Sequence, residues 1–453
     1  PQEKINLHLL HGQAELDERY QEFRLACEDE TTTDENQGRV VAEEWFTPKK
    51  RALLAPFAVG TIDQALLSVL QVRHGFVRLF GLSGKVVIID EVHSYDVYTS
   101  TLLDRLLEWL AALGSSVILL SATLPRRRRE ELLRKYGAAN NAISECSYPR
   151  ITWLPRGGNP EIIPIEARKQ GPFKIRRVGP GREAVAEELV RLIGGHGGCA
   201  VWICNTVGKA QLVYEILAPL CREVGIKLSL LHARFPFAER QRREKEALDD
   251  FGKGSLKAED DPGYRRRPVK AILVATQIVE QSLDLDFDLM VSDLAPVDLL
   301  LQRLGRLHRH EGRLRPEPFR EPIFWLLEPE MDENGIPDFG VDKNIYEEYI
   351  LLRSWLVIEK VLKDRKAIAI PEDIEDFIEA VYGPEGVTAE DNGLSEVWRK
   401  RLEEVWTKAR SERETDQGKR KPRSSKTLIA LLVLLIVIMP SLKRMTPKRA
   451  FAF

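Results

Sequence analysis

The sequence predicts an α/β protein with two domains, each built around a parallel β-sheet, because a strand–helix–strand pattern occurs once in each half of the chain. In the first half, apolar runs rich in β-branched residues at 86–90 and 117–120 are typical of buried parallel strands. The stretch between them, 102–113, has helical periodicity. Strand, helix and strand in this order form the repeating unit of a parallel sheet.

The second half repeats this pattern. Apolar runs at 199–204 and 271–275 flank a helical stretch at 208–220. The region between the two halves is rich in proline and glycine, which favour turns, so we expect a linker at 151–180. Residues 341–411 are rich in Leu, Ile, Glu and Lys and indicate further helices.

The chain is therefore expected to contain five segments. They are a first α/β domain at 1–150, the linker at 151–180, a second α/β domain at 181–335, a helical segment at 336–424 and a tail at 425–453.

The tail departs from the pattern of the rest of the chain. Its twelve apolar residues, 428–439, stand between basic flanks and are fewer than the roughly 20 that span a bilayer. We therefore expect no membrane anchor, and predict that residues from about 425 onward do not pack as a native element. A core helix or strand is the alternative interpretation.

The composition is that of a globular protein, with 43% hydrophobic and 30% charged residues. Because the net charge is only -2, a nucleic-acid-binding surface would have to be a local basic patch. Five cysteines without a CxxC pair argue against a disulfide framework or a zinc site. Since no secretory signal opens the sequence, we expect a cytoplasmic protein.

The strongest indication of chemistry is the pair Asp90 and Glu91, which directly follows the first predicted strand. Carboxylates in this place lie at the carboxyl edge of a parallel sheet, where ligands bind. There Asp90 would hold a magnesium ion, through water, and Glu91 would orient the water that attacks the γ-phosphate of a nucleotide. The alternative is an acidic turn without a catalytic role.

The second half contains a basic motif that complements these carboxylates. If residues 302–309 are helical, the spacing of Gln302, Arg306 and Arg309 brings their side chains near one face. Two neighbouring guanidinium groups suit a phosphate, and from a second domain they would act as arginine fingers. A basic surface helix is the alternative.

Four motifs occur in an order that resembles superfamily 2 helicases. They are DEVH at 90–93, Ser-Ala-Thr at 121–123, ATQIVEQSLDLD at 275–286 and QRLGRLHR at 302–309. The surrounding residues point to a narrower family. Residues 52–67, 74–93 and 231–242 are similar to the CRISPR-associated nuclease-helicase of type I systems, and the resemblance runs from about residue 5 to about residue 411.

The resemblance implies two RecA-like α/β domains, the first of them incomplete, followed by a helical segment, with ATP and Mg²⁺ as cofactors. The implied catalytic residues are Asp90, Glu91, His93, Gln302, Arg306 and Arg309. The residues implied to couple hydrolysis to domain movement are Ser121, Thr123 and Asp284. Those implied to bind nucleic acid are Gly60, Thr61, Asn205, Thr206, His232, Arg234, Thr276 and Gln277. Taken singly, each of these polar residues is equally well explained as a cap or turn residue.

Three features of the family are not found in the sequence. A phosphate loop, G-x-x-x-x-G-K-[ST], needs Ser or Thr after Gly-Lys. None of the Gly-Lys pairs here is followed by either residue. The family's nuclease carries a His-Asp metal motif, and none of the eight histidines here is followed by Asp. The tail also does not resemble the family's C-terminal accessory domain.

The function implied by the resemblance is ATP-driven translocation on single-stranded DNA, with an RNA-guided CRISPR surveillance complex as partner. Without a phosphate loop, the chain is predicted to be inactive alone, and another polypeptide would supply the missing parts. Two other functions stay open: a non-catalytic module that binds nucleic acid or a partner, and a generic superfamily 2 RNA helicase.

Overall fold

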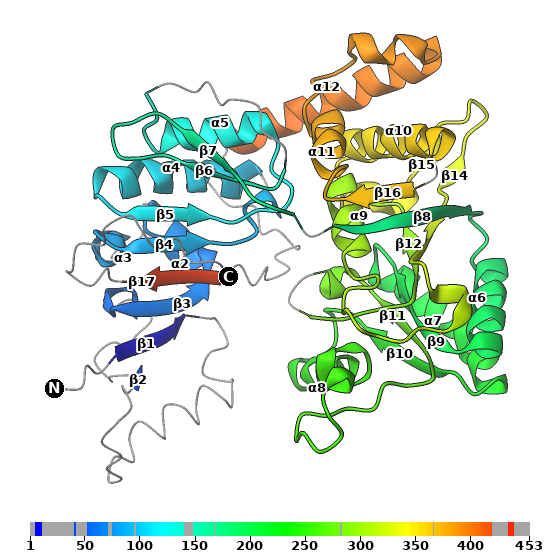
Figure 1. The fold of residues 1–453 in the computed structure, drawn as a ribbon. Coiled ribbons are helices and arrows are strands. Elements are labelled where there is room, and N and C mark those ends of the chain that lie inside the picture. The colour runs from blue at the N-terminus through cyan, green and yellow to red at the C-terminus, as the bar shows by residue number, and fades with distance from the viewer. Residues whose placement is uncertain are drawn as a thin grey trace. The chain divides into compact units, whose positions relative to one another are not determined.

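The structure is a computed structural model, and it divides into two compact units that each contain one main sheet (Figure 1). It describes residues 5–10, 40–41, 52–70, 75–94, 97–139, 148–167, 169–280, 283–365, 367–418 and 434–438. Unit 1 comprises Pro1–Glu145, Thr152–Ile163 and Arg413–Phe453. Unit 2 comprises Cys146–Ile151 and Pro164–Glu412. The predicted α/β class is confirmed in both units.

Unit 1 is built around a six-stranded sheet with the order β2-β1-β3-β17-β4-β5. Its strands are β1 (Ile5–Leu10), β2 (Val40–Val41), β3 (Phe57–Thr61), β4 (Val86–Ile89), β5 (Ser116–Leu119) and β17 (Leu434–Ile438). The pairs β1–β2, β1–β3 and β4–β5 are parallel. Strands β4 and β5, with the helix between them, form the predicted strand–helix–strand unit.

Helices pack on one face of this sheet. They are α2 (Ile62–Leu66), α3 (Gly75–Leu82), α4 (Val97–Ala112) and α5 (Arg126–Lys135). Leucines at i, i+3, i+4 and i+7 of α4, beginning with Leu103, are buried against Val87 and Ile89 of β4. Before β4, the buried Lys85 donates from Nζ to the carbonyls of Leu53 (2.8 Å) and Ala55 (2.6 Å). Burial lowers the pKa of this lysine to about 8.

The tail gives the clearest difference from the sequence prediction. Residues 434–438, which were expected to stay outside the fold, form β17 and pair antiparallel with both β3 and β4 (Figure 1). The run Leu-Leu-Ile-Val-Ile has a high β-propensity and no charge, so it suits a strand with neighbours on both sides. The alternative of a core strand is therefore correct for these five residues.

Unit 2 is built around a seven-stranded sheet with the order β10-β11-β9-β12-β13-β8-β16. Its strands are β8 (Gln170–Val178), β9 (Gly198–Ile203), β10 (Lys227–Leu231), β11 (Lys270–Ala275), β12 (Leu289–Asp293), β13 (Ile323–Leu327) and β16 (Ala367–Ile370). All neighbours are parallel except β16, which runs antiparallel to β8. Short pairs are formed by β6 (Arg150–Trp153) with β7 (Glu161–Pro164) and by β14 (Glu330–Met331) with β15 (Pro337–Asp338).

The expected linker at 151–180 is largely strand instead. It contains most of the β6–β7 pair and all of β8, which is paired in the sheet of unit 2. Phe173, Ile175 and Val178 of β8 are buried, so this segment carries part of the core although proline and glycine surround it.

Both faces of the unit 2 sheet are covered by helices. The helices that follow one another in this unit are α6 (Arg182–His196), α7 (Val207–Glu223), α8 (Phe237–Phe251), α9 (Val297–Leu304), α10 (Glu348–Asp364) and α11 (Ile374–Tyr382). Helix α12 (Glu396–Gly418) packs against α10, where Trp406 contacts Tyr349, and its residues from Arg413 onward belong to unit 1. Alternate residues of β9 enter different cores: Val201 packs in the cluster that includes α9 and α10, and Trp202 in the cluster of α6 and α7. The expected helical segment therefore packs largely on unit 2.

No helix within the described ranges combines the length and apolarity that a membrane crossing requires.

Candidate functional site

The carboxyl ends of β4 and β5 bring two of the predicted motifs into direct contact. Asp90 and Glu91 follow β4, and the backbone N–H of Glu91 donates to Oδ1 of Asp90 at 2.9 Å. The ring of His93 lies between them and the next strand: Nε2 is 3.2 Å from Oε2 of Glu91, and Nδ1 is 2.9 Å from Oγ of Ser121. His93 thus links the acidic motif to the Ser-Ala-Thr motif.

Glu91 has an unusual backbone conformation that the sequence does not reveal. Its φ of +49° lies in the left-handed region, which residues other than glycine rarely adopt. Such strain is found where the surroundings fix a functional side chain. The Glu91 side chain is 39% exposed, whereas that of His93 is 3% exposed. The Glu91 carboxylate therefore contacts solvent while the buried His93 ring holds it in place. This arrangement is compatible with the predicted role of Glu91 in orienting an attacking water.

The other predicted residues of unit 1 follow β5 or end strand β3, which β17 separates from β4. Thr123 is buried, and its hydroxyl has no hydrogen-bond partner among the described residues. Gly60 and Thr61 end β3, and Thr61 is the N-cap residue of α2 without a side-chain cap. These positions are compatible with the predicted coupling and backbone-binding roles.

In unit 2, the predicted residue Asn205 is buried at the carboxyl edge of the sheet and forms hydrogen bonds with several other elements. Its N–H donates to Oδ2 of Asp293 at 3.0 Å, and its Nδ2 donates to Oδ2 of Asp342 at 2.8 Å. Its carbonyl accepts from Nε2 of Gln277 at 2.8 Å. Asn205 and Gln277 are therefore brought together, but Asn205 is only 1% exposed, which suits coupling between strands better than direct contact with nucleic acid.

The sequence did not single out Arg303, which joins these elements. Its guanidinium is fully buried and donates to Oε1 of Glu280 (2.7 Å), Oγ of Ser292 (2.7 Å) and Oδ1 of Asn205 (3.1 Å). The sequence contains an indication of this, because Arg303 lies three residues after Leu300 and next to Leu304, among the buried residues of α9. An arginine on such a face must find buried acceptors.

Replacing Arg303 with Met is expected to lower the stability of unit 2 by about 3–5 kcal/mol, because Glu280 would be left buried without its partner. Urea unfolding followed by tryptophan fluorescence would measure this loss. Adding Glu280→Gln should recover part of it. The control Arg242→Met removes an exposed arginine of α8 and should leave the unfolding midpoint unchanged. An equal midpoint for Arg303→Met and wild type would contradict the assigned role.

Arg306 and Arg309 do not lie on a helix, contrary to the predicted spacing. Helix α9 ends at Leu304, and His308 has a φ of +49°. The chain leaves the helix because Phe287 pairs with this segment: its N–H donates to the carbonyl of Arg306 (3.0 Å), and its carbonyl accepts from the N–H of His308 (3.1 Å). Gln302 remains in α9, so the three side chains do not share one helix face.

Both arginines are held within unit 2. Arg306 donates to the carbonyls of Val279 (3.1 Å) and Glu280 (2.6 Å). Arg309 donates from Nε to Oδ1 of Asp284 at 2.6 Å. Burial alone would raise the pKa of the Asp284 carboxyl. Hydrogen bonds from Lys253, His310 and Arg309 outweigh this effect and lower the pKa to well below its ordinary value. Asp284 is thus an ionised partner that positions Arg309. A contact of either arginine with Asp90 or Glu91 stays a prediction.

The remaining predicted nucleic-acid residues lie at the carboxyl ends of neighbouring strands. The N–H of Thr276, after β11, donates to the carbonyl of Leu231 at 3.2 Å, which places Thr276 beside the end of β10. His232 follows β10 and stacks on Phe235 with ring centroids 3.9 Å apart. Arg234 is exposed.

Thr206 has the role of a cap. Its hydroxyl accepts from the N–H of Lys209 at 3.1 Å and begins α7. Lys209 itself donates to Oδ1 of Asp342 at 2.7 Å. The Gly-Lys pair that follows β9 therefore belongs to a structural ion pair, which agrees with the conclusion that it is no phosphate loop.

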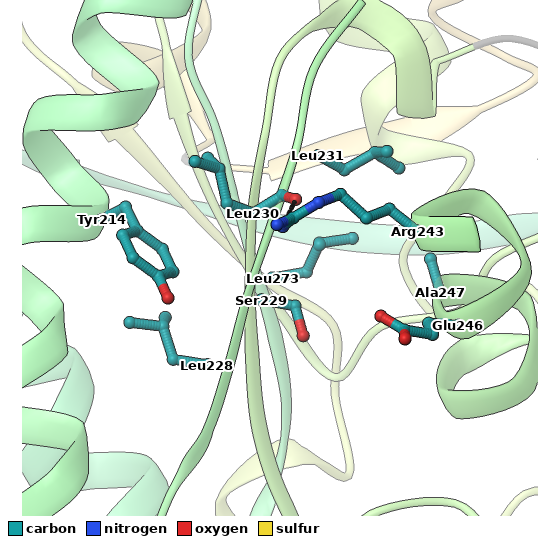
Figure 2. A pocket seen from close by; sticks show the side chains of 9 residues that line it. All are labelled: Tyr214, Leu228, Ser229, Leu230, Leu231, Arg243, Glu246, Ala247 and Leu273. Atoms are coloured by element: carbon teal, nitrogen blue, oxygen red, sulfur yellow. Dashed lines mark hydrogen bonds between the residues drawn. The ribbon is translucent and has the colours of Figure 1, made fainter. Parts of the chain in front are cut away.

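A small cavity beside β10 is also unsuited to a nucleotide (Figure 2). It lies between α7, β10 and α8, and has a volume of about 110 Å³. Ligand pockets are usually about 300–1,000 Å³, so this one has room for waters only.

The described residues contain no group of three or more His, Cys, Asp or Glu side chains that would hold a metal ion. Magnesium usually binds through one or two carboxylates and completes its coordination with water and phosphate oxygens. A single carboxylate such as Asp90 fits that mode of binding.

Known proteins that are similar to this chain share one family name. Residues 196–312 match the family model described as CRISPR-associated nuclease/helicase Cas3, C-terminal. The chain is 38% identical to the CRISPR-associated endonuclease/helicase Cas3 of Thermus thermophilus, over 92% of this chain and 47% of that protein. It is 34% identical to the Escherichia coli protein of the same name, over 83% of this chain and 41% of the relative. Over most of its length, the chain is therefore similar to one part of the Cas3 nuclease-helicases.

The solved Cas3 structures confirm the predicted RecA-like fold. The crystal structure of T. fusca Cas3 has a TM-score of 0.77 and 35% identity, covering 91% of this chain and 45% of that one. A similar chain in the structure of a pre-nicking CRISPR RNA-guided surveillance complex has a TM-score of 0.72 and 33% identity, covering 91% of this chain and 48% of that one. The chain thus spans about half the length of the Cas3 proteins it matches.

Proposed function

We propose that this chain is the ATP-hydrolysing and translocating part of a type I CRISPR nuclease-helicase that acts on single-stranded DNA in the cytoplasm. The observation that carries the proposal is the link from Glu91 through His93 to Ser121 at the carboxyl ends of β4 and β5. It joins the residue that would orient the attacking water to the motif that would respond to hydrolysis. The crystal structure of T. fusca Cas3-ATP, at 35% identity, supports the choice of nucleotide.

The residues of the chain divide the work as follows. Asp90 would hold magnesium through water, and the bound ion would neutralise part of the phosphate charge. Glu91 would orient the attacking water, with His93 fixing its carboxylate. Arg306 and Arg309 would stabilise negative charge on the transferred phosphoryl group. For that they must exchange at least part of their present contacts with Glu280 and Asp284 for phosphate oxygens.

Single-stranded DNA would be bound through its phosphates, without contacts that recognise particular bases. The hydroxyl of Thr61, the exposed Arg234 and the residues around Thr206 and Thr276 suit contacts to phosphates, which carry no sequence information. The buried Asn205 would couple such contacts to Arg303 and so to the basic motif. The surveillance complex is proposed as partner solely because the related chain at 33% identity belongs to such a complex.

A comparison of single-stranded DNA with RNA tests this function. The chain would be co-expressed with a polypeptide that supplies a phosphate loop, and ATP hydrolysis measured with each nucleic acid. We expect stimulation by DNA, little stimulation by RNA, and loss of turnover in Glu91→Gln. Equal stimulation by RNA would favour a generic RNA helicase. DNA binding without any hydrolysis would favour a non-catalytic binding module.

A further inference from the structure

The turn before helix α10 brings two side chains to residues of the predicted nucleic-acid site. Asp342 lies in the short helix η8 (Gly340–Asn344), and Tyr346 lies between η8 and α10. The Asp342 carboxylate accepts from Nδ2 of Asn205 at 2.8 Å, and the Tyr346 hydroxyl accepts from Nε2 of Gln277 at 2.8 Å. One turn therefore contacts the residues that follow β9 and β11, although the sequence analysis singled out neither Asp342 nor Tyr346.

The turn holds the hydroxyl of Tyr346 in place. The N–H groups of Ile345 and Tyr346 both donate to the carbonyl of Asp342 at 2.9 Å, which closes the turn. Asp342 is buried, and Nζ of Lys209 donates to the other oxygen of its carboxylate at 2.7 Å. The ring of Tyr346 packs against the core cluster that includes α9 and α10. Burial raises the pKa of the Tyr346 hydroxyl, so it stays protonated at neutral pH.

The side-chain amide of Gln277 has both of its N–H groups occupied. One donates to the carbonyl of Asn205 at 2.8 Å, and the other donates to the hydroxyl of Tyr346. Because a carbonyl can only accept, the bond to Asn205 determines which end of the amide is nitrogen. While both bonds are kept, this nitrogen has no N–H left to donate to a phosphate. The amide nitrogen of Gln277 therefore suits a link between strand ends better than a phosphate contact of its own.

Gln277 is also one end of a series of hydrogen bonds that reaches the basic motif. Its partner Asn205 accepts through Oδ1 from Arg303 at 3.1 Å, and Arg303 donates to Oε1 of Glu280 at 2.7 Å. The carbonyl of Glu280 accepts from Arg306 at 2.6 Å. Contiguous hydrogen-bond networks of this kind can carry energetic coupling between distant sites. The series thus gives a physical route between the segment at Gln277 and Arg306.

We propose that Tyr346 is a positioning residue for the binding of single-stranded DNA. Its hydroxyl fixes the side chain of Gln277 and, through it, the segment that contains Thr276 and the end of β9 at Asn205. Tyr346 acts through Gln277 and makes no contact with DNA itself. The inference rests on the proposed function, because it takes the segment at Thr276 and Gln277 as part of the DNA-binding surface. Without the hydroxyl, one N–H of a half-buried amide loses its partner, and Gln277 is free to rotate away from Asn205.

The first test replaces Tyr346 with Phe, which keeps the ring and its packing and removes only the hydroxyl. Affinity for single-stranded DNA would be measured on the full chain, without ATP, from the fluorescence anisotropy of a labelled thymidine oligonucleotide. We expect Tyr346→Phe to weaken binding about three- to tenfold, which corresponds to the loss of one hydrogen bond. The matched control Tyr382→Phe removes the hydroxyl of another tyrosine of unit 2, which donates to Asp298, and should leave the affinity unchanged.

A second pair of variants separates positioning from a general effect on the fold. Gln277→Met keeps the approximate length of the side chain and removes the amide. If Tyr346 acts through Gln277, adding Tyr346→Phe to Gln277→Met should change the affinity by less than about twofold. An equal loss on adding Tyr346→Phe to the wild type and to Gln277→Met would show that the hydroxyl serves the fold alone, and would overturn the proposal.

Hydrogen exchange in the unchanged chain tests the bond without any substitution. With isotope-labelled glutamine, nuclear magnetic resonance should show that the side-chain amide protons of Gln277 exchange at least about tenfold more slowly than those of the exposed Gln241 in α8. Equally fast exchange of the two would overturn the proposal even if Tyr346→Phe did not fold. A wild-type chain that binds no oligonucleotide would contradict the proposed function, and the inference with it. Binding that Tyr346→Phe leaves unchanged would contradict the inference alone.

Discussion

The isolated chain is expected to hydrolyse ATP at least about 10⁵-fold more slowly than the same chain supplied with a phosphate loop. Glu91 and Asp90 can orient water and hold magnesium, and Arg306 and Arg309 can stabilise charge, but none of them grips the β- and γ-phosphates. Positioning of reactants contributes about 7–11 kcal/mol in well-oriented reactions, and about 1.4 kcal/mol corresponds to a factor of ten in rate.

A DNA-stimulated phosphate-release assay on the chain alone, and on the chain with the added polypeptide, would measure this ratio. Glu91→Gln provides the matched control, since it removes the water-orienting carboxylate and keeps the shape of the side chain. Turnover by the chain alone that disappears in Glu91→Gln would show that its phosphate site lies elsewhere and that the expected inactivity is wrong.

Deletion of residues 425–453 is expected to destabilise unit 1 severely. This reverses the sequence-based expectation that the deletion raises solubility without loss of fold. Strand β17 pairs with β3 and β4 on its two sides, so its removal leaves both strands with unpaired edges in the middle of the sheet. We expect a fall of at least about 10 °C in the melting temperature of unit 1, from a loss of several kcal/mol.

The same assay distinguishes pairing from general effects of the tail. Deleting only residues 440–453 keeps β17 and should leave the melting temperature of unit 1 nearly unchanged. Replacing Val437 with Pro should reproduce most of the loss, because proline removes a backbone donor within a central strand. Equal melting of the full chain and the 425–453 deletion would restore the original interpretation of the tail.

The elements that the sequence predicted best are those with strong local patterns. The buried runs that became β4, β9 and β11 are continuous and β-branched, and helix α7, which follows β9, agrees with the predicted stretch. Strand β10 and helix α8, which also lie between β9 and β11, were not predicted. The contact of Glu91 with Ser121 through His93 was not predicted from the sequence, although strand order accounts for it, since the carboxyl ends of parallel strands meet.

What the sequence did not predict depends on contacts between distant residues. Whether 434–438 is a strand is decided by the neighbours β3 and β4, which no local pattern contains. Likewise, the helix was expected to continue through Arg306 because its spacing is helical, but the pairing of Phe287 with this segment ends it. Arg303 was overlooked because a buried arginine and an exposed one look alike in a basic motif.

The position of β17 also has a consequence for the order of folding during synthesis. Its partners Thr61 and Ile89 leave the ribosome long before Leu434 and Leu435. Unit 2 has its seven strands complete well before that point, so it is expected to fold first. Until then the sheet of unit 1 lacks the strand between β3 and β4. The pairing of β17 with these two strands joins residues that are far apart in the sequence, and such contacts form slowly. Nascent unit 1 is therefore expected to stay incomplete until residues 434–438 have been synthesised.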